Sequence, residues 1–395
     1  MKRAGPFLAG LVALYFVIAL EVLVMISPFA GLFYAAFNPV LLFLARSRAT
    51  GWLCGFFLPH MVSPPGALLR AVRVAGSALF LLGAAGFLVN AAQVYWSKLR
   101  RGGPVVVGAY RIVRHPQYLS LAACGLGLTI LWPRFLTAAL WAVMVALYYA
   151  LARDEERRMT GRFGEAYLSY AAKTGMFLPA GLERRLALFP GPRSGTVRVA
   201  FCLAAALSFS VGGAFALRAY TVRRLPIWSA GPVSALPLLP TDLPMVRHRM
   251  AGVLELPEVR RRLPEGAPVL AYVLPVEYVM QGMIADTGED WRLYQHHQSW
   301  SMIADWILHP FRHLEGGHAA LHHGASGMAA SAVRRIIFVR VNTRSGATSP
   351  AALLDLSAER TPLFMADVDL HELFCQEVRD LGPGTGWGDV PTPMF

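Results

Sequence analysis

Long apolar runs constrain this chain more than any other feature of its sequence. A helix needs about 20 apolar residues to cross the core of a bilayer. The chain is 55% hydrophobic and only 15% charged, which is too apolar for an ordinary soluble protein. We therefore predict an integral membrane protein with about five to six membrane helices. The candidate spans are 6–26, 29–45, 75–96, 119–132, 135–152 and 197–217, and 51–62 is predicted as a short interfacial or re-entrant piece.

The run 119–132 is too short to cross comfortably alone, and "WPR" at 132–134 is typical of a turn. It is therefore expected to pair with 135–152 in a helical hairpin at 119–152. A hairpin returns the chain to the side it left, so 97–118 and 153–196 should share one face of the membrane. Both segments are rich in arginine, which predicts that this face is cytoplasmic and that the membrane is the cell inner membrane. The formal charge of +13 is then explained by basic segments that stay on the cytoplasmic side of the membrane, and no nucleic-acid partner is predicted.

The composition changes after residue 218. A proline-rich stretch, "LPIWSAGPVSALPLLPTDLP" at 225–244, reads as a linker before a mixed α/β module. Strands are predicted at 269–276, 335–341 and 362–370. The predicted organisation is an all-α polytopic membrane domain at 1–195, an additional membrane helix at 196–218 and a smaller mixed α/β module at 219–395.

Seven histidines fall between 296 and 323, and the pairs His309/His313 and His318/His322 have a spacing that can chelate a metal on one helix face. However, Pro310 interrupts the first pair and no cysteine accompanies either one. The four cysteines of the chain form no CxxC pair. We therefore predict no metal site and no disulfide framework.

The stretch "GAYRIVRHPQYLSL" at 108–121 has the features of a polar site. Gly108 permits a turn, and Pro116 disfavours helix at His115. Tyr110 and Tyr118 offer ring faces with hydroxyl tips. Irregular backbone at membrane depth is tolerated only where it is buried in protein or lines a cavity. The stretch thus predicts a polar pocket at the membrane surface.

A second stretch, "RDEERRMTGRFGEAYLSY" at 153–170, follows the hairpin directly and carries the adjacent carboxylates Glu155 and Glu156. The hairpin should bring this pair back beside the stretch 108–121.

Together the two stretches resemble the isoprenylcysteine carboxyl methyltransferase and phospholipid methyltransferase superfamily, over about 75–180. The resemblance implies an integral membrane enzyme that takes S-adenosylmethionine (SAM) from the cytosol and methylates a lipophilic or membrane-delivered acceptor. The matching residues are Gly108-x-Tyr110-Arg111-x-Val113-Arg114-His115-Pro116-x-Tyr118, then Glu155-Glu156-x-x-Met159-x-x-x-Phe163-Gly164-x-x-Tyr167-x-x-Tyr170, and then Pro179.

Carried over to this chain, the resemblance implies a cofactor site, and the chemistry of the residue types makes Arg114 the candidate catalytic residue. The chemistry of the residue types agrees, because the SAM ammonium favours a carboxylate, its carboxylate favours N–H groups or arginine, and its sulfonium favours aromatic faces. Methyl transfer mainly requires orientation and exclusion of water, so no metal is needed. The implied cofactor-binding residues are Gln93, Val105, Tyr110, His115, Pro116, Gln117, Tyr118 and Glu155.

Several alternatives stay open. The prenylcysteine enzymes have an arginine one helical turn before the glutamate pair, where this chain has Leu151, so an amine, thiol or other lipid-like acceptor is equally consistent. Arg114 could be a cofactor ligand, a substrate ligand or a topology signal. Two other functions are an NADPH-dependent membrane reductase of the sterol-reductase type and a membrane-anchored metal- or partner-binding module.

Overall fold

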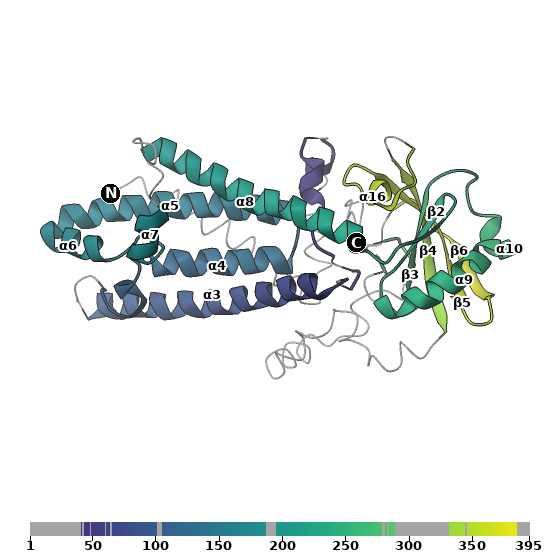
Figure 1. Cartoon of the computed structure of the whole chain (residues 1–395), viewed down its shortest axis with the longest axis horizontal. Coiled ribbons are helices and arrows are strands. Elements are labelled where there is room, and N and C mark those ends of the chain that lie inside the picture. The colour runs from purple at the N-terminus through teal and green to yellow at the C-terminus, as the bar shows by residue number, and fades with distance from the viewer. Residues whose placement is uncertain are drawn as a thin grey trace. The chain divides into compact units, whose positions relative to one another are not determined.

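The structure is a computed structural model, and its chain divides into two compact units. The described part of the first, helical unit lies within 72–133 and 137–215 (Figure 1). The second unit, called the sheet module below, comprises described residues within 41–71, 134–136 and 216–384. The residues that the structure describes are 41, 43–47, 49–59, 61–63, 65–100, 105–186, 195–278, 281–282, 284–288, 332–343 and 346–384.

Among the described residues, three helices are long and apolar enough to cross a membrane, within Ala67–Ser97, Phe135–Phe163 and Gly195–Arg224. Apolar helices were predicted at 75–96, 135–152 and 197–217, and all three are confirmed. The run 6–26 and most of the run 29–45 lie outside the described residues. The helices of this part are α3 (Ala67–Leu99), the 3-10 helix η2 (Gly108–Arg111), α4 (Pro116–Leu131), α5 (Phe135–Phe163), α6 (Glu165–Lys173), α7 (Ala180–Leu186) and α8 (Gly195–Arg224).

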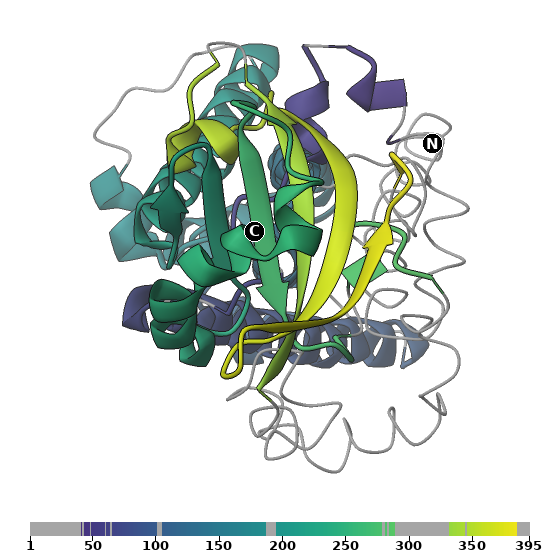
Figure 2. The same ribbon diagram turned by 90° about the vertical axis from the view of Figure 1, so that its right-hand side faces the viewer.

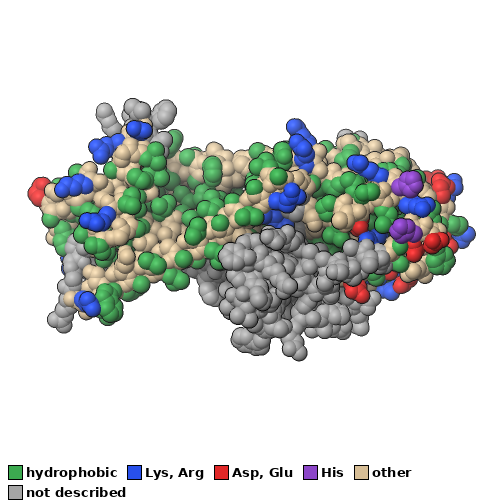
Figure 3. All heavy atoms as spheres, turned by 60° about the horizontal axis from the view of Figure 1, so that its bottom comes forward, with side chains coloured by type: hydrophobic (Ala, Val, Ile, Leu, Met, Phe, Trp, Pro, Cys, Tyr) green, Lys and Arg blue, Asp and Glu red, His purple; other side chains and the backbone are tan. Residues whose placement is uncertain are grey.

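Large apolar side chains are exposed on the helical unit, and hydrophobic patches are visible along it in Figure 3. Leu82 and Leu88 of α3 are 73% and 66% exposed, and Phe201 and Phe209 of α8 are 65% and 64% exposed. A patch of this kind is unfavourable in water and favourable against lipid. The surface therefore agrees with a membrane protein.

The predicted hairpin is present, since α4 and α5 lie side by side and only residues 132–134 separate them (Figure 1). The indole N–H of Trp141 in α5 donates to the carbonyl of Ala122 in α4 at 2.8 Å. The helix α5 runs beyond the predicted 152 to Phe163, so it carries both Glu155 and Glu156.

Glycines let α3 and α4 approach until their backbones touch. A Cβ atom added to Gly83 would lie 2.4 Å from the backbone nitrogen of Cys124, and one added to Gly127 would lie 2.4 Å from that of Phe80. Close packing through small residues is a common way for membrane helices to associate. This contact fixes α4, which begins at the candidate site.

In the part of the sheet module that the structure describes, six strands form one sheet in the order β1-β2-β3-β4-β5-β6, seen side by side in Figure 2. β2 and β3 are parallel because the chain crosses over through α9 and α10, and the other neighbours are antiparallel. The elements are the 3-10 helix η1 (Gly51–Cys54), β1 (Trp228–Ala230), β2 (Val233–Pro237), the 3-10 helix η3 (Pro240–Asp242), α9 (Leu243–Glu255), α10 (Pro257–Arg260), β3 (Val269–Leu274), β4 (Val333–Asn342), α16 (Pro350–Leu353), β5 (Glu359–Asp369) and β6 (Phe374–Asp380).

The strands predicted at 269–276, 335–341 and 362–370 are confirmed as β3, β4 and β5. The proline-rich stretch expected to be a linker instead contains β1 and β2. Pro232 precedes β2 and Pro237 is its last residue, so neither proline interrupts the middle of the strand. All five residues of β2 are buried, which makes this stretch part of the core.

Two consecutive arginines of β4 form buried ion pairs on opposite faces of the sheet, because side chains alternate along a strand. Arg334 pairs with Asp242 at 2.9 Å, and each of these side chains is 2% exposed. Arg335 pairs at 2.6 Å with Asp367, its cross-strand partner on β5. Both faces of the sheet are therefore buried at this part of β4, and each holds a paired charge.

The segment 51–62, predicted as an interfacial or re-entrant piece, packs within the sheet module. Arg134 donates to the carbonyl of Cys54 at 2.7 Å, and Tyr278 donates to that of Met61 at 3.1 Å. Arg218 also donates to the carbonyl of Phe56.

Candidate functional site

After the short 3-10 helix η2, the backbone from Ile112 to His115 is irregular, and a second segment of chain stabilises it. Gly108 has φ +62°, a conformation that glycine adopts readily. The backbone N–H of Arg114 donates to Gly175 at 2.8 Å, and that of His115 donates to Met176 at 3.1 Å. These bonds satisfy N–H groups that no helix satisfies. Pro116 then starts α4, where its missing N–H is harmless.

The turn after α6 fits closely against this stretch. A Cβ atom on Gly175 would lie 1.7 Å from the carbonyl oxygen of Leu178, so only glycine fits there. The hydroxyl of Tyr170 donates to the carbonyl of Tyr110 at 2.7 Å. The segment that contains α6 and α7 thus holds the stretch 108–115 in place.

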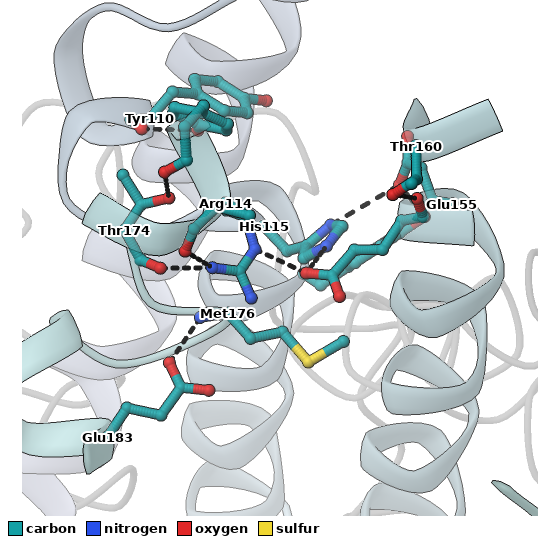
Figure 4. A network of polar contacts seen from close by, with 12 residues as sticks. Tyr110, Arg114, His115, Glu155, Thr160, Thr174, Met176 and Glu183 are labelled. Carbon is teal, nitrogen blue, oxygen red and sulfur yellow. Dashed lines mark hydrogen bonds and ion pairs between the residues drawn. The ribbon is translucent and has the colours of Figure 1, made fainter. Parts of the chain in front are cut away.

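The two carboxylates of α5 lie beside the imidazole of His115 (Figure 4). The distance from His115 Nδ1 to Glu155 Oε2 is 3.6 Å, and that from His115 Nε2 to Glu156 Oε1 is 3.4 Å. The hydroxyl of Tyr118 donates to Glu155 Oε2 at 3.4 Å. His115 is only 6% exposed, whereas the Glu155 side chain is 48% exposed. Glu155 is therefore the member of the pair that can meet a ligand.

Arg114 joins this network from the other side (Figure 4). Its Nε donates to Glu156 Oε1 at 2.6 Å, and its Nη1 donates to the carbonyl of Ala171 at 2.9 Å and to that of Thr174. The predicted contact between Arg114 and a substrate or cofactor stays a prediction. The contacts seen here connect Arg114 to its own protein.

Three aromatic rings stack at the site. The centroids of His115 and Tyr118 are 5.7 Å apart with planes at 17°, and those of Tyr118 and Tyr148 are 5.3 Å apart with planes at 12°. Near-parallel rings at these separations are offset, as is usual for aromatic pairs. The hydroxyl of Tyr118 therefore meets Glu155, while its ring stacks with those of His115 and Tyr148.

Burial and charge set the protonation of this site. Burial lowers the pKa of His115, but its contacts with Glu155 and Glu156 outweigh burial, and the net pKa is raised. Burial, reinforced by the negative charge of Glu155, raises the pKa of Tyr110. His115 is therefore held in its charged form over a wider pH range than usual, and Tyr110 remains a neutral phenol.

Gln93 of α3 reaches this site from a third direction. Its amide lies directly against Gly108, since a Cβ atom at Gly108 would be 3.0 Å from Gln93 Nε2 and 3.3 Å from Oε1. Within the described part of the chain, Gln93 Oε1 is buried without a hydrogen-bond partner. A buried amide oxygen without a donor is unfavourable, so this atom is suited to accept a bond from a ligand or a water molecule.

The structure brings together most of the residues that the sequence proposed. Tyr110, Arg114, His115, Tyr118 and Glu155 share one network, and Pro116 starts the helix that carries Tyr118. Val105 and Gln117 are half-buried nearby and take no part in the hydrogen bonds of the network as described.

Four residues of the site were not proposed from the sequence. Glu156 could have been predicted as a site residue from the sequence. It adjoins Glu155, and a histidine can interact with one carboxylate at each of its two nitrogens. Tyr148 lies seven residues before Glu155, so helical spacing already placed both on one face of α5. Tyr170 belongs to the matching motif without having been proposed as a cofactor-binding residue. Nothing in the local pattern marked Phe177, whose ring lies 5.8 Å from that of His115.

Comparison of the chain with protein-family models, curated proteins and solved structures finds no match. Among the described residues, no group of three or more His, Cys, Asp or Glu side chains could hold a metal ion. The histidines between 296 and 323 lie outside the described residues.

Proposed function

We propose that this protein is an integral membrane methyltransferase that moves a methyl group from SAM to a lipid-like or membrane-delivered acceptor. One observation carries the proposal. Two sequence stretches with the same family resemblance meet in a single network, where Tyr118 and His115 contact Glu155 across an interval of about 40 residues. A solvated helix face would not require a buried histidine between its two carboxylates.

The residues of the site fit SAM. The half-exposed carboxylate of Glu155 suits the SAM ammonium, because a charged pair with a positioned carboxylate gives a strong hydrogen bond. The buried oxygen of Gln93 suits an N–H or O–H donor of the nucleoside. When bound, SAM supplies an electrophilic methyl group on a sulfonium.

The protein's own part in such a reaction is to bind, orient and exclude water. His115 holds Glu155 in place, and the ring of Tyr118 is held by stacking with those of His115 and Tyr148. Methyl transfer is an in-line displacement, so correct placement of the two reactants supplies most of the catalysis. Leu151, one turn before Glu155, is buried and apolar, and the acceptor in this proposal remains an amine, a thiol or another lipid-like group.

We place the site on the cytoplasmic face of the cell inner membrane. Exposed basic side chains gather at this end of the helical unit, at the left of Figure 3. The positive-inside rule favours the cytoplasmic side for such a cluster. Its members include Arg111, Arg157, Arg158, Arg162, Arg184 and Arg185.

The test uses the full chain, purified in detergent, with SAM and NADPH as separate ligands. We expect SAM to raise the melting temperature and NADPH to leave it unchanged. Membranes that contain the protein should then transfer label from methyl-labelled SAM to a lipid or another acceptor. A shift with NADPH alone would instead support a reductase, and no shift with SAM together with no label transfer would refute the proposal.

A further inference from the structure

Arg114 holds three parts of the helical unit together. Its side chain reaches Glu156 of α5 at 2.6 Å and the carbonyl of Ala171 in α6 at 2.9 Å. Its backbone N–H reaches Gly175 in the turn after α6 at 2.8 Å. The guanidinium group has several donors in a fixed plane, which allows one side chain to serve several acceptors at once.

The contact between Arg114 and Glu156 is the first in a series of contacts that leads to Glu155. Glu156 also meets Nε2 of His115, and Nδ1 of the same ring meets Glu155. The order of contacts is therefore Arg114, Glu156, His115, Glu155, with Tyr118 at the end. Along this series of contacts the side chains go from buried to exposed. Those of Arg114 and His115 are 13% and 6% exposed, and that of Glu155 is 48% exposed.

We propose that Arg114 is a positioning residue that couples docking of the segment 164–183 to the alignment of Glu155. In this role Arg114 orients the ligand-facing carboxylate through Glu156 and His115 and does not touch the substrate. The part of the inference that concerns SAM rests on the proposed function. The docking part does not, because it follows from contacts within the protein.

The matched variants are R114Q, R114K, E156Q and the double variant R114Q/E156Q, with R111Q as control. Arg111 is an exposed neighbour on the same stretch, outside the network described above. If Arg114 acts through Glu156, R114Q and E156Q should each weaken SAM affinity about tenfold, and the double variant should also lose about tenfold, not about a hundredfold. R111Q should bind SAM like the wild type. Losses that multiply in the double variant would show independent roles and overturn the inference.

Hydrogen exchange of the full chain tests docking without SAM. In R114Q and R114K the amides of His115 and Gly175 should exchange faster than in the wild type, because neither substituted side chain can reach Glu156 and the carbonyls of Ala171 and Thr174 together. R114K keeps the charge and is the variant to use if R114Q does not fold. Exchange and SAM affinity both unchanged in R114K would overturn the inference. A wild type that binds no SAM would refute the proposed function, and the exchange rates would still decide the docking role.

Discussion

The hydroxyl of Tyr118 lies 3.4 Å from Oε2 of Glu155, joining the start of α4 to the polar end of α5. If Glu155 binds the SAM ammonium, E155Q should weaken SAM affinity about ten- to a hundredfold, since a hydrogen bond to a charged group contributes about 1.5–3 kcal/mol. Y118F should have a smaller effect in the same direction, because it leaves the carboxylate charged. Calorimetry on the detergent-purified variants measures both.

The control for these variants is E165Q, which removes an exposed carboxylate from the first turn of α6. Its SAM affinity should equal that of the wild type. Equal affinity in E155Q and the wild type would mean that Glu155 is not the ammonium ligand.

The raised pKa of His115 predicts a dependence of stability on pH. The folded protein binds the His115 proton more tightly than the unfolded chain, whose histidine has a pKa near 6.5. The stabilisation is therefore fully present below about pH 6.5 and is lost as the pH rises through the raised pKa of the folded state. H115Q lacks it at every pH.

Thermal unfolding of wild type and H115Q between about pH 5.5 and 9 tests this point. The difference between their melting temperatures should be largest at the acidic end and should shrink as the pH rises. The opposite trend would mean that the carboxylates do not stabilise the charged imidazole.

The backbone contact between α3 and α4 predicts that Gly83 cannot be enlarged. G83A would place a methyl group 2.4 Å from the backbone nitrogen of Cys124. Because the clash is with backbone, no side-chain rotation can relieve it. We expect a loss of about 1–3 kcal/mol or more in unfolding free energy, as for other overpacked cores. The matched control is G161A in α5, where the added carbon would have no atom within 4 Å beyond the local backbone of its own helix and its chain neighbours. A melting temperature for G83A at or above that of G161A would contradict the described packing.

The ion pair between Arg334 and Asp242 predicts a marked asymmetry between single and double substitutions. D242N leaves a buried arginine without its carboxylate and should lower the unfolding free energy of the sheet module by about 3–5 kcal/mol. R334M/D242L removes both charges and should recover much of that loss. Denaturant unfolding of the full chain, followed through the module's transition, compares the two. A double variant less stable than D242N would show that the pair contributes more than the burial of apolar side chains in its place.

The sequence alone was enough to predict the apolar helices and the hairpin, because length and hydropathy leave few other structures for such runs. It was also enough to predict β3, β4 and β5, whose apolar runs carry the strand pattern. The prediction of a linker at 225–244 was wrong, because this stretch contains β1 and β2 in spite of prolines at 232 and 237. Proline is disfavoured in the middle of a strand but tolerated at its ends. Only the pairing with β3 shows that Pro232 and Pro237 lie at the ends of a strand.

For the candidate site, the sequence determined which chemical groups are present and, through the hairpin, that 108–118 and 155–156 share one end of the helical unit. It could not determine which groups touch. The tertiary structure decided that His115 lies between two carboxylates, that Arg114 bonds to Glu156, and that the turn at Gly175 pairs with the stretch before α4. The physical reason is that these contacts join residues about 40 to 60 positions apart, and their geometry depends on helix packing and on backbone pairing, which local sequence patterns do not encode.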